Sequence, residues 1–474
     1  MSQPATTTHR HAPDWVILTM ACLAQFMVVL DVSIVNVALP SMQRDLHFSM
    51  SSAQWVVNAY VLTFAGFLLL GGRAADIFGR RRVYLSGLGV FVIASIGAGF
   101  AATGGQIVAV RALQGIGGAI LSPATLTIIV TTFHGTRLPK AIGVWSATAG
   151  AGGAVGGLLG GILTGWASWR WVFFINVPIG IVAAVVAAMY LREMRNRDAA
   201  VKLDVTGAAL VTSALATLIY GVVNTPNEGW TSATTMSWFL AGAVLLVSFI
   251  FWESRVASHP LVPFRIFKSR SLSVANLVML LVGGAFFAMW YFLTFYYQYI
   301  LGYDAVKTGF AFLPMALSII AGAQISSRIL AKVGVRPLLF VGATMATLGF
   351  AWISLIQDHS TYLGAILAPS IICAFAMGLL FTPLATAATA KVERSDAGLA
   401  SGVLNTARQV GGSISLAVLG TIAADRTATF VNPHSATALV SGYQRAFQIS
   451  AAITALALVT SLALPSATGK RHSH

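Results

Sequence analysis

Apolar stretches long enough to cross a lipid bilayer recur along the whole 474-residue chain, and they constrain its fold more than any other feature. A membrane-spanning helix needs about 20 mostly apolar residues, and about fourteen such stretches alternate with short polar connections. Because lipid offers the backbone no hydrogen-bond partner, each stretch that crosses must satisfy its own amide groups as a helix. Charged residues make up 9% of the chain, against roughly 25% in soluble domains. The sequence therefore predicts an all-α, multi-pass membrane protein.

The basic residues account for the formal net charge of +15 without a nucleic-acid partner. If the N-terminus is cytoplasmic, most arginines and lysines fall in cytoplasmic connections, and only Arg44, Arg170, Lys307 and Arg426 fall outside. Cytoplasmic loops of multi-pass proteins carry such an excess. The pattern predicts that both termini are cytoplasmic, that the number of spans is even, and that the protein lies in the bilayer of the cell (inner) membrane.

The predicted organisation is two six-span bundles, 15–191 and 272–464, joined by a segment, 192–271, that holds two additional spans. The tails, 1–14 and 465–474, are expected to be cytoplasmic, and the first apolar run is too long for a cleavable signal peptide. The additional spans carry no charge within their apolar parts. We therefore expect them to pack outside the bundles without lining a path through them.

The turn from Gly72 to Arg82 has a weaker counterpart from Ser327 to Arg336, in which Gly79 aligns with Gly334. Parallel repeats place a binding site between two bundles in rocking transporters. Since cytoplasmic turns are generally basic, chance similarity is the alternative explanation of this pair.

Asp31 is the only acidic residue deep inside an apolar stretch. A charge within the bilayer is costly and usually marks an ion or proton pathway, and a carboxyl group shielded from water holds a proton more readily. Arg111 lies at a similar depth, given the rise of about 1.5 Å per residue, so we expect it to face Asp31 or its proton pathway. Two alternatives remain: Asp31 is a packing carboxylate paired with an arginine, or Arg111 extends to the outer headgroups.

Four segments resemble motifs of one family. The turn from Gly72 to Arg82 fits G-x-x-x-D-x-x-G-R-[KR]-[KR] and resembles the signature of the major facilitator superfamily. Leu30 to Pro40, Arg111 to Gly118 and Ser168 to Gly180 resemble first-, fourth- and sixth-span motifs of its fourteen-span drug:proton antiporters. The resemblance implies the major facilitator fold, two six-helix bundles plus two extra helices, with Asp31 and Arg111 in proton coupling. It also implies a conformational gate at Gly72, Asp76, Gly79, Arg80 and Arg81.

The fifth apolar stretch is rich in glycine and resembles the motif that marks exporters in this superfamily, although Gly157 replaces its usual proline. Residues four apart share a helix face, so this stretch predicts two adjacent smooth ridges that let another helix approach closely and slide. Ordinary helix packing is the alternative. The motif comprises Gly143, Gly152, Gly156, Gly157, Gly160 and Gly161.

Candidate substrate-binding residues come from several predicted spans. The ninth stretch is dense in aromatic residues, which suits stacking on flat or cationic drugs, but such rings also serve as core, lipid-facing surface or interfacial belt. Arg408 is a second buried cation that either hydrogen-bonds a substrate or stabilises helix packing. The candidates are Asn36, Gln114, Trp290, Tyr291, Phe295, Asn405 and Arg408.

The sequence and the resemblance together predict a proton-coupled antiporter that exports lipophilic drugs or antibiotics by alternating access. It would work as a monomer with the proton gradient as its energy source and no cofactor. With Asp31 as the only deep acid, we expect neutral or monovalent substrates to be preferred over dications. The alternatives are a dedicated exporter of one endogenous metabolite or antibiotic and a non-transporting receptor on the same fold. An enzyme is not expected, since no metal cluster or catalytic nucleophile is recognisable in the sequence. Cys22 and Cys373 lie far apart in two predicted spans, and no disulfide is predicted.

Overall fold

The computed structural model describes residues 13–133, 137–191, 203–390, 397–433 and 435–464. Within these ranges the regular elements are helices, with no strand. Eleven helical segments are long and apolar enough to cross a membrane, which confirms an all-helical, multi-pass architecture. The N-terminal helices are α1 (Asp14–Leu46), α2 (Met50–Phe78), α3 (Arg80–Gly99), α4 (Gly104–Thr132), α5 (Arg137–Trp166), α6 (Trp171–Phe174) and α7 (Asn176–Tyr190).

The remaining helices form a hairpin and a second bundle. The hairpin is α8 (Val205–Glu228) and α9 (Ala233–Phe251), continued by η1 (Trp252–Val256) and followed by η2 (Phe264–Lys268). The second bundle holds α10 (Arg270–Phe295), η3 (Tyr296–Ile300), α11 (Ala305–Val333), α12 (Val335–Ile353), η4 (Tyr362–Ile366), α13 (Leu367–Thr389), α14 (Ala397–Ala428) and α15 (Ala436–Ser461).

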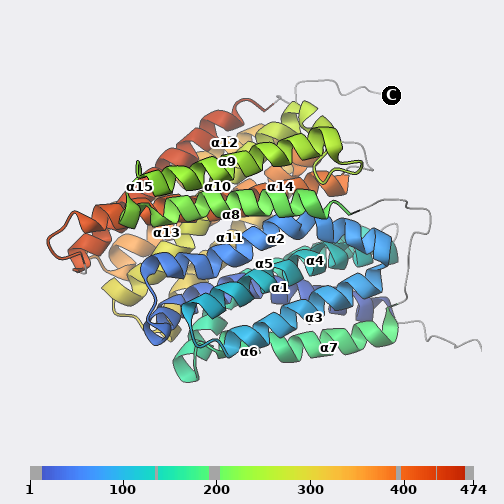
Figure 1. Ribbon diagram of the computed structural model, residues 1–474, viewed down its shortest axis with the longest axis horizontal. Coiled ribbons are helices and arrows are strands. Elements are labelled where there is room, and N and C mark those ends of the chain that lie inside the picture. The colour runs from blue at the N-terminus through green and yellow to red at the C-terminus, as the bar shows by residue number, and fades with distance from the viewer. Residues whose placement is uncertain (1–12, 134–136, 192–202, 391–396, 434, 465–474) are drawn as a thin grey trace, which may run out of the picture.

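The two bundles repeat one packing pattern. In the first, α1 packs along α5, α2 along α4, α3 along α4, and α7 against α3; in the second, α10 packs along α14, α11 along α13, α12 along α13, and α15 against α12. The bundles meet mainly where α5 packs on α11 and α2 packs on α14. In Figure 1 they lie one above the other, with long helices running along the horizontal axis.

Gly79 and Gly334 have the same backbone role in the two bundles. Gly79, between α2 and α3, has φ 96°, and Gly334, between α11 and α12, has φ 86°. Residues with a side chain rarely adopt these angles. The alignment predicted from the two turns is therefore confirmed in backbone conformation.

The hairpin lies over the junction of the bundles. α8 packs on both α2 and α14, and α9 packs on α8 (Figure 1). An apolar cluster fills the contact, formed by Leu62, Leu215, Ile219, Val223 and Ala417. Asp204 begins the hairpin, because its carboxylate accepts hydrogen bonds from the Gly207 amide at 2.7 Å and the Trp252 indole at 2.8 Å.

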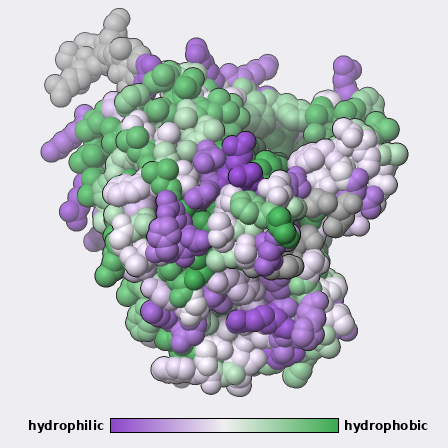
Figure 2. All heavy atoms as spheres, turned by 90° about the vertical axis from the view of Figure 1, so that its left-hand side faces the viewer, coloured by the Kyte–Doolittle hydropathy of each residue, from purple (hydrophilic) through white to green (hydrophobic). Residues whose placement is uncertain are grey.

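Three further helices, α5, α14 and α15, are 30, 32 and 26 residues long and pack within the same bundles. They are not among the eleven apolar segments, so the predicted number of fourteen spans stays a prediction. The left-hand end of Figure 1, seen face-on in Figure 2, shows hydrophilic residues over the middle of that face and many hydrophobic residues around its rim. The predicted tails lie mostly outside the described residues, and the predicted domain boundaries stay predictions.

Candidate functional site

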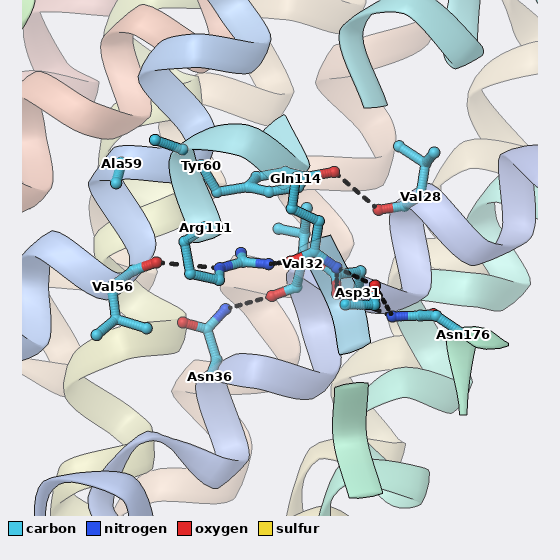
Figure 3. Close-up of polar contacts among 12 residues, drawn as sticks. Val28, Asp31, Val32, Asn36, Val56, Ala59, Tyr60, Arg111, Gln114 and Asn176 are labelled. Atoms are coloured by element: carbon cyan, nitrogen blue, oxygen red, sulfur yellow. Dashed lines mark hydrogen bonds and ion pairs between the residues drawn. The ribbon is translucent and has the colours of Figure 1, made fainter. Parts of the chain in front are cut away.

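Asp31 lies at the centre of a buried polar network inside the first bundle (Figure 3). One carboxylate oxygen of Asp31 is 2.5 Å from Nη1 of Arg111. The other accepts hydrogen bonds from the amide nitrogens of Gln114, at 2.7 Å, and Asn176, at 3.1 Å. The exposed fractions of the side chains are 0% for Asp31 and 1% for Arg111. The carboxylate is thus compensated by one cation and two amide donors, as a buried charge requires.

The Arg111 guanidinium is held by helices α1, α2 and α4 together. Its Nε donates to the carbonyl of Val56 at 3.1 Å, and its Nη1 also donates to Oε1 of Gln114 at 2.6 Å. The guanidinium carbon lies 4.2 Å from the ring centre of Tyr60, a cation–π distance. The predicted contact with Asp31 is confirmed, and the alternative of an arginine extended to the headgroups is wrong, because the side chain is buried.

Two members of the network were not expected from the sequence. The Ser95 hydroxyl accepts from Gln114 at 2.7 Å, and Asn176 adds its amide from the start of α7. Both side chains are fully buried. The available signal was a polar residue within a predicted span, and Asn176 stands inside a segment already recognised as a motif.

A cavity of about 470 Å³ lies between the two bundles. Its described lining comes from four helices of each bundle, α1, α2, α4, α5, α10, α11, α13 and α14, and none of it from α8 or α9. This agrees with the expectation that the hairpin does not line the path. Drug-sized ligands occupy cavities of about 300–1,000 Å³, so this one can hold such a molecule.

The cavity gathers some of the predicted substrate-binding residues and not others. Its lining includes Asn36, Trp290, Asn405 and Arg408, but not Gln114, Tyr291 or Phe295. Gln114 belongs to the Asp31 network, and Tyr291 and Phe295 pack against each other with ring centres 4.7 Å apart, within the core of the second bundle. Substrate binding at all seven positions stays a prediction.

Two hydrogen bonds connect the bundles near the C-terminal end of α1. The Gln298 side chain of η3 donates to the Val37 carbonyl at 2.9 Å, and the Tyr299 hydroxyl donates to Oε1 of Gln43 at 3.1 Å. The predicted outer side of the membrane is at this end.

The glycine ridges of α5 face two different helices. Gly152, Gly156 and Gly160 lie against α1, where an added Cβ at Gly156 would be 2.6 Å from Cβ of Ser33. Gly157 and Gly161 face α11 of the other bundle, where a Cβ at Gly161 would be 2.3 Å from the Ala305 carbonyl oxygen. The predicted ridges are therefore present, and one of them forms the junction of the bundles.

The predicted gate lies around the α2–α3 turn. Gly72 faces Pro123 of α4 with room for a Cβ at 3.7 Å, and Arg81 donates to the Ala188 carbonyl of α7 at 2.7 Å. Arg80 begins α3 directly after Gly79. The side chain of Asp76 and the surroundings of Gly143 lie outside the described part of the structure.

Among the described residues, no group of three or more His, Cys, Asp or Glu side chains could hold a metal ion. Cys22 and Cys373 are buried free thiols.

Comparison with known proteins gives a consistent family. Residues 21–416 match the Major Facilitator Superfamily profile. The chain is 42% identical to the "Cephamycin export protein CmcT" of Amycolatopsis lactamdurans, over 94% of this chain and 91% of that protein. It is 37% identical to the "Puromycin resistance protein pur8" of Streptomyces alboniger, over 95% and 90%.

Among solved structures, the fold resembles that of a bacterial homologue of the human lysosomal transporter Spinster in an inward-facing and occupied conformation. The TM-score is 0.68 at 16% identity, and the match covers 97% of each chain. Profile, sequence relatives and fold agree, and the chain therefore belongs to the Major Facilitator Superfamily.

Proposed function

We propose that the protein is a proton-coupled antiporter that exports lipophilic drugs or antibiotics across the cell membrane, as a monomer with fourteen spans and both termini in the cytoplasm. Export of antibiotics is supported by relatives named for cephamycin export and puromycin resistance. The observation that carries the proton-coupling proposal is the buried Asp31–Arg111 pair on helices that also line the cavity.

In the proposed cycle, α1 links proton binding to substrate binding. Asp31 lies directly before Val32 and Ser33, which line the cavity, while its own side chain points into the polar network on another side of α1. Protonation of Asp31 removes its negative charge and so weakens its attraction to Arg111. The resulting shift of α1 relative to α4 changes the cavity wall, and so couples the proton to the cargo.

The junction of α5 and α11 suits the rocking step that alternating access requires. Its close contacts are made by glycine residues and backbone atoms. At Gly309, for example, an added Cβ would lie 2.7 Å from the Gly157 carbonyl oxygen. Smooth helix surfaces of this kind can move past one another without disengaging side chains.

Purified protein in liposomes, given an imposed pH step and a panel of dyes and antibiotics, tests the proposal. We expect uphill export by the wild type and its loss in Asp31→Asn. The matched control is Asp45→Asn, the same substitution on the same helix at a side chain that is half exposed. Equal proton-driven export by Asp31→Asn and wild type would reject proton coupling at this site. Transport of one compound only would favour a dedicated exporter, and no transport of any compound by wild type would favour a receptor.

A further inference from the structure

The described residues that line the cavity carry a positive charge. Arg408 is the one charged side chain of that lining, which is otherwise apolar, amide or hydroxyl in character. The Asp31 carboxylate does not line the cavity and is already occupied by Arg111, Gln114 and Asn176. Within the described structure, a cationic cargo would therefore meet a like charge and no counter-charge.

The Arg408 guanidinium is incompletely paired. It donates to Oδ1 of Asn405 at 2.8 Å, and its carbon lies 5.9 Å from the ring centre of Phe381. No described carboxylate lies within ion-pair distance of it. A guanidinium carries five N–H donors in a fork that matches a carboxylate, so donors remain for a ligand.

The backbone of α10 makes room for this arginine. A Cβ at Gly283 would be 3.0 Å from Cγ of Arg408, and Gly283 also lines the cavity. The stem of the arginine therefore lies against α10 with its head in the cavity wall. The side chain is partly exposed, and the surface it exposes belongs to the cavity.

Aromatic rings make up much of the wall of the cavity that Arg408 lines. Phe286, Phe287 and Trp290 of α10, Phe312 of α11 and Phe381 of α13 all line the cavity. Such walls accept flat apolar groups by offset or edge-to-face packing.

We propose that the preferred cargo is an amphipathic organic monoanion, with its carboxylate on Arg408 and its apolar body against the aromatic wall. The proposal builds on the proposed function by naming its substrate class. It predicts discrimination by charge at constant shape, because only the anion gives the Arg408 guanidinium a counter-charge.

Binding measurements on detergent-purified protein test this without any proton gradient. The probes are pyrenebutyrate, its methyl ester, and a trimethylammonium compound with the same pyrene body, measured by equilibrium dialysis at neutral pH. We expect wild type to bind pyrenebutyrate about 10- to 100-fold more tightly than the ester, which is the range expected for a hydrogen-bonded charge, and to bind the ammonium compound most weakly.

Variants of Arg408 test whether this side chain causes the preference for the acid. Arg408→Gln should abolish the preference for the acid while ester binding persists, and Arg408→Lys should keep part of it. Ester binding and thermal unfolding report whether each variant is folded. Equal binding of acid and ester by wild type, preference for the ammonium compound, or an unchanged preference in folded Arg408→Gln would overturn the inference. A failure of pH-driven transport with charge-selective binding intact would reject proton-coupled export and leave this inference standing.

Discussion

The Asp31–Arg111 pair allows a quantitative test through its unfolding free energy. Asp31→Asn keeps the shape of the side chain but leaves the Arg111 guanidinium buried with neutral acceptors, the Val56 carbonyl and Gln114. Removing one partner of a buried pair typically costs about 3–5 kcal/mol, because the other charge stays uncompensated. With exposed fractions of 0% and 1%, solvent cannot screen this charge. We therefore expect Asp31→Asn to lower the free energy of unfolding by an amount near that range, and Arg111→Gln to lower it by a similar amount.

The double variant Asp31→Asn/Arg111→Gln removes both charges and should recover most of the stability, since replacing a buried ion pair by neutral groups is often close to neutral. The assay is reversible unfolding in mixed detergent micelles, followed by circular dichroism. Asp45→Asn is the control: its pair with Arg170 is half exposed, so its loss should stay below about 1 kcal/mol. If the two single losses simply add in the double variant, the two groups are not coupled and the reasoning is refuted.

Four further predictions concern the helix junctions, the α2–α3 turn and the charge balance of transport. Gly161→Val should slow transport and lower the free energy of unfolding by about 1–3 kcal/mol, because its Cβ would lie 2.3 Å from the Ala305 carbonyl oxygen. Unchanged transport and an unchanged melting temperature would contradict this. Gly79→Ala should lower the free energy of unfolding by about 1–3 kcal/mol in the same assay, because alanine is strained at the positive φ of 96°. An unchanged free energy of unfolding would show that this backbone conformation is not strained for alanine. Cross-linking a Gln43→Cys/Tyr299→Cys variant with a thiol reagent should stop export until a reductant is added, and continued export would show that this contact need not open. If an anion leaves for each proton that enters, two charges move inward, and a potential of 100 mV should contribute about 4.6 kcal/mol; export unaffected by an imposed potassium diffusion potential would contradict that exchange.

The sequence predicted the site better in some elements than in others. The depth estimate that placed Arg111 beside Asp31 was successful because both lie on long helices with a regular rise. The alignment of Gly79 with Gly334 was also successful, because a helix break with positive φ leaves a local mark in the sequence. Tyr291 and Phe295 were grouped with Trp290 by composition alone, whereas only Trp290 of these three lines the cavity.

The sequence by itself determined that this chain forms apolar helices and that one carboxylate lies deep within them, because hydrophobicity and backbone hydrogen bonding act over neighbouring residues. The tertiary structure decided most of the contacts that each side chain makes. Asp31 contacts Asn176 from 145 residues away, which the sequence did not predict, while Arg408 faces the cavity without a carboxylate among the described residues. Such partners depend on how each helix is rotated and which neighbours it packs against, and the local sequence pattern does not encode either.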